Sequence, residues 1–158
     1  LNDGAPINAF GVGTKMGTSA DRPYLDGIYK LCETMLPNGS FAPIMKLSKD
    51  KITLPGRKQV YRFKNEEGKL LKDVIALSDE GVDCEPLLVQ VIEKGKVTYK
   101  LPSLEVIRGY AAGNLADLPE QYNALVNAPA YPVELSPKLQ NLIETLKEHI
   151  TRNEINPR

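Results

Sequence analysis

Near the start of this chain, glycine, hydroxyl and cationic residues follow one another in a pattern suited to binding an anion. The segment from Ile7 to Thr18 reads Ile-Asn-Ala-Phe-Gly-Val-Gly-Thr-Lys-Met-Gly-Thr. Gly11 and Gly13 allow a tight turn and a close approach of the backbone to a bulky group. Successive free N–H groups in such a turn form a nest for an anion. Thr14 and Thr18 add hydroxyl donors, and Lys15 adds a positive charge. The candidate phosphate-binding residues are therefore Gly11, Val12, Gly13 and Thr14.

An apolar run precedes and overlaps these glycines and predicts a strand that is buried on both faces. Its apolar residues are Ile7, Ala9, Phe10 and Val12. A strand that ends in a glycine turn is a common place for phosphate in α/β proteins. A plain turn at the exit of a strand is the alternative. A dinucleotide fingerprint fits poorly, because Gly17 comes one position late and hairpins follow where a helix and a parallel strand are needed.

Composition and charge exclude several classes of function. The 158 residues include 20 Lys and Arg and 20 Asp and Glu, so the net charge favours neither nucleic acid nor an anionic membrane as partner. No apolar run reaches membrane-spanning length. Cys32 and Cys84 share no metal-type spacing and are predicted to be free, part-buried thiols of a cytoplasmic protein. With one histidine and no cysteine cluster, we predict no zinc site and no metal ligands in this chain.

Turn signals at short intervals predict an antiparallel sheet, as a sandwich or small barrel, through the middle of the chain. Asn38-Gly39 is a hairpin dipeptide, and Glu93-Lys94-Gly95-Lys96 closes a later hairpin. The predicted strands are residues 27–34, 42–47, 52–54, 60–63, 70–77, 85–93 and 97–101.

Two helices are predicted after this sheet. Ser103 is a plausible N-cap of the first helix, and Pro119 ends it. Ser136 caps the second helix, with Pro137 at its first position. The apolar face of the second helix is formed by Leu139, Leu142, Ile143, Leu146 and Ile150. The fold class is therefore α+β, with a sheet followed by two C-terminal helices.

Several blocks of the sequence resemble the C-terminal part of nicotinate phosphoribosyltransferases, in the order of that family. These blocks are residues 10–14, 18–19, 25–31, 45–48, 54–62, 101–104 and 131–136. The resemblance implies a catalytic body that is an irregular α/β barrel, most of it upstream of Leu1. On this reading, residues 1–26 hold the last barrel strand and the phosphate turn, 27–101 the β-rich region and 102–158 the helical region.

The resemblance also implies an activity and a role for the glycine turn. Nicotinate and phosphoribosyl pyrophosphate would give nicotinate mononucleotide and pyrophosphate, with Mg²⁺ and ATP as cofactors of the full-length enzyme, in NAD biosynthesis. The turn at 11–14 would hold the phosphate of phosphoribosyl pyrophosphate, with Thr14 at the family's substrate-contacting threonine. The base and ATP sites would lie upstream, so no catalytic residue is assigned here and the chain alone is expected to be inactive.

The partners implied by the resemblance are the two substrates, the rest of the barrel and a second subunit of a homodimer, with neither nucleic acid nor membrane. The rival reading is a non-enzymatic β-rich binding or scaffold module. Arg57-Lys58 forms a basic corner with two interpretations. It faces the anionic substrates or a partner subunit, or it is simply a solvated turn. His149 lacks the family's catalytic histidine motif and is predicted to be a surface side chain near a helix C-terminus.

Overall fold

The computed structural model describes residues 4, 6, 8–9, 11–18, 20, 23–24, 27–48, 51–124 and 126–155, the last three by their backbone only. The chain divides into two compact units, Leu1–Lys30 and Leu31–Arg158. The first unit contains one short helix, α1 (Thr14–Gly17). Before it, the described residues 8–9 and 11–13 are exposed and have no regular structure. Ile7 and Phe10 lie outside the described residues, so the strand expected here stays a prediction.

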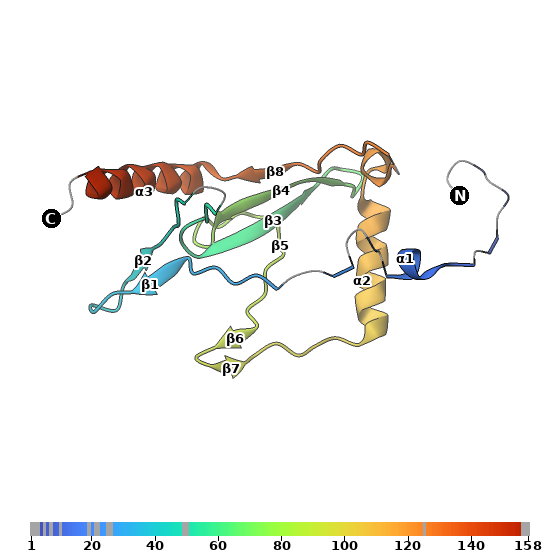
Figure 1. Ribbon diagram of the computed structural model, residues 1–158, viewed down its shortest axis with the longest axis horizontal. Coiled ribbons are helices and arrows are strands. Elements are labelled where there is room, and N and C mark those ends of the chain that lie inside the picture. Colours follow the sequence, from blue (N-terminus) through green and yellow to red (C-terminus); the bar gives the residue numbers. More distant parts are fainter. Residues whose placement is uncertain are drawn as a thin grey trace. The chain divides into compact units, whose positions relative to one another are not determined.

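The second unit is built on a four-stranded sheet in the order β5-β3-β4-β8 (Figure 1). Strands β3 (Lys58–Lys64) and β4 (Leu70–Leu77) form an antiparallel hairpin. Asn65 shapes its turn, because its Oδ1 accepts from the backbone N–H groups of Glu67 and Lys69 at 3.1 and 2.8 Å. Both strands agree closely with the prediction, because long alternating patterns between clear turns define a strand well.

The sheet is mixed, whereas the sequence predicted antiparallel pairing throughout. β5 (Glu85–Pro86) pairs antiparallel with β3, but β8 (Val133–Leu135) pairs parallel with β4. A parallel neighbour requires a long crossover connection, and here the crossover includes a helix. Since β8 has only three residues, its sequence carries too few positions to show an alternating pattern.

Two small hairpins lie outside the central sheet, and their strands are shorter than predicted. They are formed by β1 (Glu33–Met35) with β2 (Phe41–Pro43) and by β6 (Ile92–Glu93) with β7 (Lys96–Val97). Their turns adopt positive φ at Gly39, at Lys94 and at Gly95, as the turn residues predicted. Residues 27–32 and 87–91 were expected to be strand and are not. Their backbone hydrogen bonds to neighbouring segments are isolated, such as that from Leu87 N to Val60 O at 2.8 Å, and form no continuous ladder.

Helices α2 (Leu104–Asp117) and α3 (Pro137–Ile155) confirm both predicted helices and their caps. A short 3₁₀ helix, η1 (Glu120–Asn123), follows α2. Ser103 Oγ accepts from Val106 N at 3.4 Å, and Ser136 Oγ accepts from Leu139 N at 3.1 Å. None of the residues of α2 is buried, whereas α3 contributes two residues to the core.

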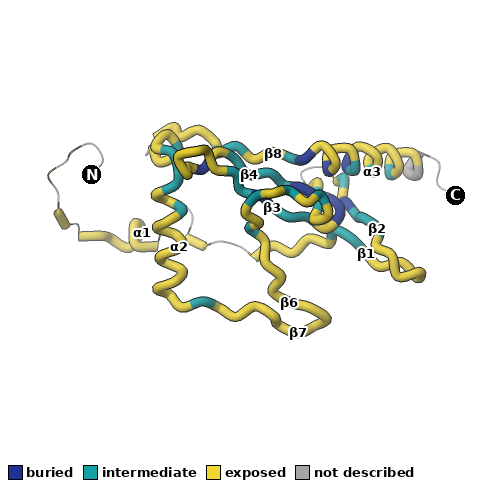
Figure 2. Tube along the Cα trace, turned by 180° about the vertical axis from the view of Figure 1, so that it is seen from behind, coloured by how far each residue is buried: buried dark blue, intermediate teal, exposed yellow. Residues whose placement is uncertain are grey.

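The core lies where α3 packs against β4 and the segment that precedes β3. Its buried members are Met45, Leu139 and Ile143, and the half-buried apolar residues around them are Leu47, Leu54, Ile75, Leu77, Leu135, Leu146 and Ile150. Burying a leucine such as Leu139 contributes about 1.5–3 kcal/mol. Figure 2 shows the contrast, with buried residues near α3 and exposed residues along α2, β6 and β7. The α+β class is thus confirmed.

Candidate functional site

The predicted phosphate residues, Gly11 to Thr14, lie together in one exposed segment that leads into α1. Gly13 has φ −76° and ψ 166°, an extended conformation that any residue adopts. A Cβ atom at Gly11 or Gly13 would meet no heavy atom within 4 Å among the described neighbours. Neither backbone conformation nor packing among the described residues therefore requires a glycine at these positions.

The hydrogen bonds of this segment leave the amide groups at the start of α1 available. Gly13 O accepts from Met16 N and Gly17 N at 3.1 and 3.0 Å. Thr14 O accepts from the backbone N–H and the hydroxyl of Thr18 at 2.9 and 2.7 Å. Among the described residues, the amide groups of Thr14 and Lys15 have no acceptor, as expected at the first turn of a helix. The segment can thus offer N–H groups and a hydroxyl to an anion.

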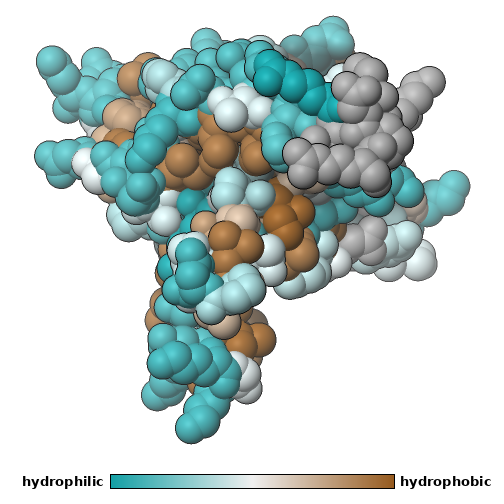
Figure 3. Space-filling model, turned by 90° about the vertical axis from the view of Figure 1, so that its left-hand side faces the viewer, coloured by the Kyte–Doolittle hydropathy of each residue, from teal (hydrophilic) through white to brown (hydrophobic). Residues whose placement is uncertain are grey.

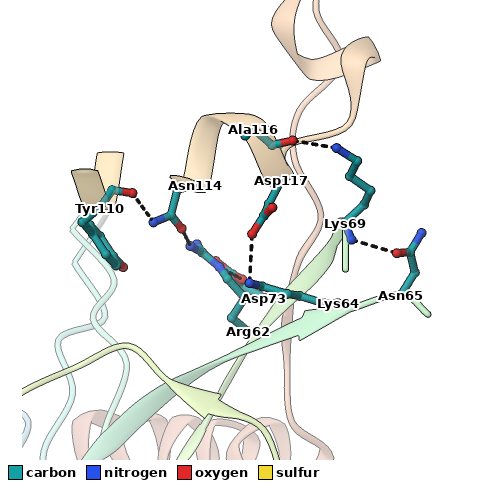
Figure 4. A network of polar contacts seen from close by, with 9 residues as sticks. All are labelled: Arg62, Lys64, Asn65, Lys69, Asp73, Tyr110, Asn114, Ala116 and Asp117. Carbon is teal, nitrogen blue, oxygen red and sulfur yellow. Dashed lines mark hydrogen bonds and ion pairs between the residues drawn. The ribbon is translucent and has the colours of Figure 1, made fainter. Parts of the chain in front are cut away.

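A polar cluster that the sequence did not single out lies where β3, β4 and α2 meet (Figure 4). Arg62 Nε and Nη2 donate to Asp73 Oδ1 and Oδ2 at 2.9 and 2.8 Å, and Arg62 Nη1 donates to Asn114 Oδ1 at 2.7 Å. The hydrogen bond to Asp73 raises the pKa of Arg62. All three guanidinium nitrogens are thus engaged inside the fold, so the cluster serves structure rather than ligand binding.

The same cluster extends to a tyrosine from the segment before β8. Tyr131 Oη donates to Asp73 Oδ1 at 3.4 Å, and its ring packs edge-on against Tyr122 with the centroids 5.4 Å apart. Burial, together with the charge of Asp73, raises the pKa of Tyr131. No sequence signal could have identified this cluster, because its members come from four separate segments that only the fold brings together.

Further polar contacts hold only the C-terminal end of α2. Lys64 Nζ donates to Asp117 Oδ2 at 3.0 Å, and Lys69 Nζ donates to Ala116 O at 2.7 Å. Together with Asn114, these contacts fasten the last turn of α2 to the β3–β4 hairpin. The N-terminal half of α2 takes no part in them.

The basic corner divides into one inward and one outward side chain. Lys58 Nζ donates to the carbonyl oxygens of Leu54 and Gly56 at 2.8 and 2.5 Å. Burial lowers the pKa of Lys58, while Cys32 and Glu33 oppose this shift. Arg57 is exposed, pairs with Glu33 at 3.0 Å, and lies over the ring of Phe41. Lys58 therefore fixes the turn before β3, and only Arg57 can face an external anion.

The remaining side chains that could take part in chemistry form no cluster among the described residues. Cys32 and Cys84 are free and half-buried, and His149 is an exposed residue of α3. In the part of the chain that the structure describes, no group of three or more His, Cys, Asp or Glu residues could hold a metal ion. None of the described helices combines the length and apolar character needed to cross a bilayer.

Comparison with known proteins connects these features to one family. The nicotinate phosphoribosyltransferase C-terminal domain matches residues 81–143. Nicotinate phosphoribosyltransferase of Bacillus subtilis is 33% identical over 159 residues, which cover 84% of this chain and 32% of that protein. The human nicotinate phosphoribosyltransferase is 31% identical over 169 residues, which cover 91% of this chain and 30% of that protein. The chain corresponds to the C-terminal portion of nicotinate phosphoribosyltransferases.

The fold agrees with this assignment. The crystal structure of human nicotinic acid phosphoribosyltransferase matches 60% of this chain and 23% of its own, with a TM-score of 0.54 and 29% identity. The chain spans about a third of the length of the curated relatives that it matches. The family domain at 81–143 includes α2, β8 and the first turns of α3, and hence Asn114 and Tyr131 of the polar cluster.

Proposed function

We propose that this chain is the C-terminal part of an enzyme that makes nicotinate mononucleotide and pyrophosphate from nicotinate and phosphoribosyl pyrophosphate. ATP hydrolysis would drive the reaction, which belongs to NAD biosynthesis and takes place in the cytoplasm. The observation that carries the proposal is the similarity to nicotinate phosphoribosyltransferases over 84% or more of the chain. In this role the central sheet, α2 and α3 brace the barrel that forms the catalytic body.

We propose that the segment from Gly11 to Thr14 binds the phosphate of phosphoribosyl pyrophosphate. In the reaction a C–N bond to the base forms while the C–O bond to pyrophosphate breaks. An enzyme that holds a non-reacting phosphate can use that binding energy to orient the reacting carbon. Two observations support this proposal: the described fold does not require glycines at these positions, and the amide groups that follow them have no acceptor among the described residues. We place this segment at the end of the last barrel strand.

Mg²⁺ and ATP belong to the proposed enzyme, but the described residues of this chain do not fit a Mg²⁺ site. They bring together no group of acidic side chains that could hold the ion. We therefore assign both groups to the remainder of the enzyme and derive no step through them. We also propose that the enzyme is a homodimer, with neither nucleic acid nor a membrane as partner.

The experiment that tests this function compares the chain alone with a polypeptide extended to the length of its relatives. Each is incubated with nicotinate, phosphoribosyl pyrophosphate, ATP and Mg²⁺, and nicotinate mononucleotide is assayed. We expect turnover by the extended enzyme and none by the chain alone. Steady turnover by the chain alone would show that the reaction does not need the additional polypeptide. An inactive, folded extended protein would favour the binding-module alternative.

A further inference from the structure

An apolar groove lies between α2 and the extended segments on either side of β6 and β7. Its volume is about 470 Å³, and its lining includes Val89, Tyr99, Val106, Ile107 and Tyr110. Glu85 is the one charged residue of the lining. The groove therefore suits an apolar protein surface better than an ionic ligand. In Figure 1, β6, β7 and the adjoining start of α2 extend away from the central sheet.

The groove is unusually exposed for a folded chain. Val89, Val106 and Tyr110 are each 60–61% exposed. Isolated apolar residues on a surface are ordinary, but a continuous apolar surface of this kind marks an interaction site. Figure 3 views a different face, from the α3 end of Figure 1, and apolar side chains are exposed there among polar ones as well.

Helix α2 itself needs a covering surface. None of its residues is buried, and the side-chain hydrogen bonds that join it to the β3–β4 hairpin all come from its last turn. A helix of 14 residues is marginal in isolation, and Gly109 and Gly113 weaken it further. A surface that packs against Val106 and Tyr110 would therefore stabilise the N-terminal half.

The apolar segment that precedes β6 lines a second hollow as well as the α2 groove. Val89 lines both, and Leu88 and Ile92 line the second hollow, of about 770 Å³, together with Arg57 and Lys58. Leu88 and Ile92 are 52% and 57% exposed. A body that covers both hollows must contact this segment from two sides.

The lengths of the relatives identify such a body. This chain corresponds to 30–32% of the human and Bacillus subtilis proteins, so each carries more than twice as much additional polypeptide. We infer that the α2 groove and the segment at 88–92 form the surface on which the upstream body of the same polypeptide docks. The inference rests on the proposed function, because only the full-length enzyme contains that body.

A photocrosslinking experiment tests this inference. The extended polypeptide is made with benzoylphenylalanine at Tyr110 or, in a second version, at Val89, so that one site remains if the other disturbs folding. Glu144, an exposed residue of α3, is the control position. Equal amounts of ¹⁴N- and ¹⁵N-labelled protein are mixed before irradiation, so that mass spectrometry separates crosslinks within one chain from those between two copies.

We expect both groove positions to crosslink to the upstream part of their own chain at least about tenfold more than Glu144 does. Crosslinks between light and heavy chains, no enrichment over Glu144, or a coding sequence without an upstream body would each overturn the inference. The test does not depend on activity. Failure of the proposed reaction would leave the crosslinks in place, whereas failure of the docking would leave turnover without them.

Discussion

Arg62 and Asp73 lie directly opposite each other on β3 and β4, and the guanidinium donates to both carboxylate oxygens. This bidentate pair is largely buried, with 17% and 11% of the two side chains exposed. Because Arg62 also donates to Asn114 and Asp73 accepts from Tyr131, the pair joins the hairpin to α2 and to the segment before β8. It is one of the points at which C-terminal elements are fixed to the central sheet.

Replacing Arg62 by methionine should therefore destabilise the chain markedly. Asp73 would be left as a largely buried charge without its partner, a change that costs about 3–5 kcal/mol when burial is complete. Since some solvent reaches both side chains, we expect a loss of about 2–4 kcal/mol in the free energy of unfolding, measured with denaturant. Arg152→Met is the matched control.

Arg152 pairs with Glu148 at 3.3 Å, and 79% of its side chain is exposed. Exposed pairs of this kind contribute about 0–1 kcal/mol. Equal losses of unfolding free energy for the Arg62 and Arg152 variants would show that the polar cluster does not stabilise the fold.

The two helix caps should differ in their contribution to stability. Ser136 is buried, caps α3 at 3.1 Å and also donates to Glu80 Oε1 at 2.6 Å. Ser136→Ala should thus lower the free energy of unfolding by about 1–2 kcal/mol. Ser103 caps α2 through a longer contact of 3.4 Å at an exposed position, so Ser103→Ala should cost less than about 0.5 kcal/mol. A larger effect at Ser103, in denaturant unfolding of the same chain, would contradict this ranking.

Stability should fall at alkaline pH because of Tyr131. Burial and the neighbouring Asp73 raise the pKa of Tyr131 above its ordinary value of 10.0. The folded chain then holds this proton more tightly than the unfolded chain. The resulting stabilisation is complete below about pH 10 and is lost as the pH rises through the raised pKa.

Unfolding free energies measured between about pH 8 and pH 11 check this expectation. Tyr131→Phe should remove part of the alkaline decline, whereas Tyr29→Phe should not, because Tyr29 is 85% exposed. Identical pH profiles for the two variants would mean that Tyr131 does not hold its proton more tightly in the folded state.

The sequence predicted those elements whose pattern is local. β3, β4, α2 and α3 each have clear periodicity or a cap, and the structure confirms them. The parallel pairing of β8 with β4 was missed because it depends on a crossover that spans the segment from residue 78 to residue 132. Strands were predicted too long at 85–93 and 97–101, because apolar alternation there reflects an exposed surface rather than a paired sheet.

The candidate residues that the sequence indicates differ from those that the structure brings together. The glycine turn was found because its residue types are unusual at that spacing, and its role stays a prediction. The polar cluster was not predicted, since an arginine and an aspartate 11 positions apart can be recognised as partners only when the hairpin register is known. Lys58 was assigned to a basic corner, yet three nearby carbonyl groups hold it inside the turn.

His149 should be dispensable for the proposed reaction. It is exposed on α3 and lacks the histidine motif of the family. In the extended enzyme, His149→Ala should leave the rate and the coupling to ATP hydrolysis within about twofold of the original, as for other surface substitutions. Steady-state assays of nicotinate mononucleotide and ADP check this, and loss of ATP coupling would show that His149 takes part in the reaction.

We propose that Gly13 and Thr14 hold the phosphate of phosphoribosyl pyrophosphate. Gly13→Val should block the close approach, although the described fold has room for the side chain. Thr14→Val keeps the shape of the side chain and removes one hydrogen bond to a charged group, a loss of about 1.5–3 kcal/mol. Thr145→Val makes the same chemical change at an exposed position on α3 and serves as the control.

The most direct measurement is kcat/KM for phosphoribosyl pyrophosphate in the extended enzyme carrying Thr14→Val, at matched folding stability. We predict a loss of roughly tenfold to a hundredfold, with smaller effects on the kinetics of nicotinate and ATP and none from Thr145→Val. An unchanged kcat/KM for phosphoribosyl pyrophosphate would show that Thr14 does not bind this phosphate and that the segment is an ordinary turn.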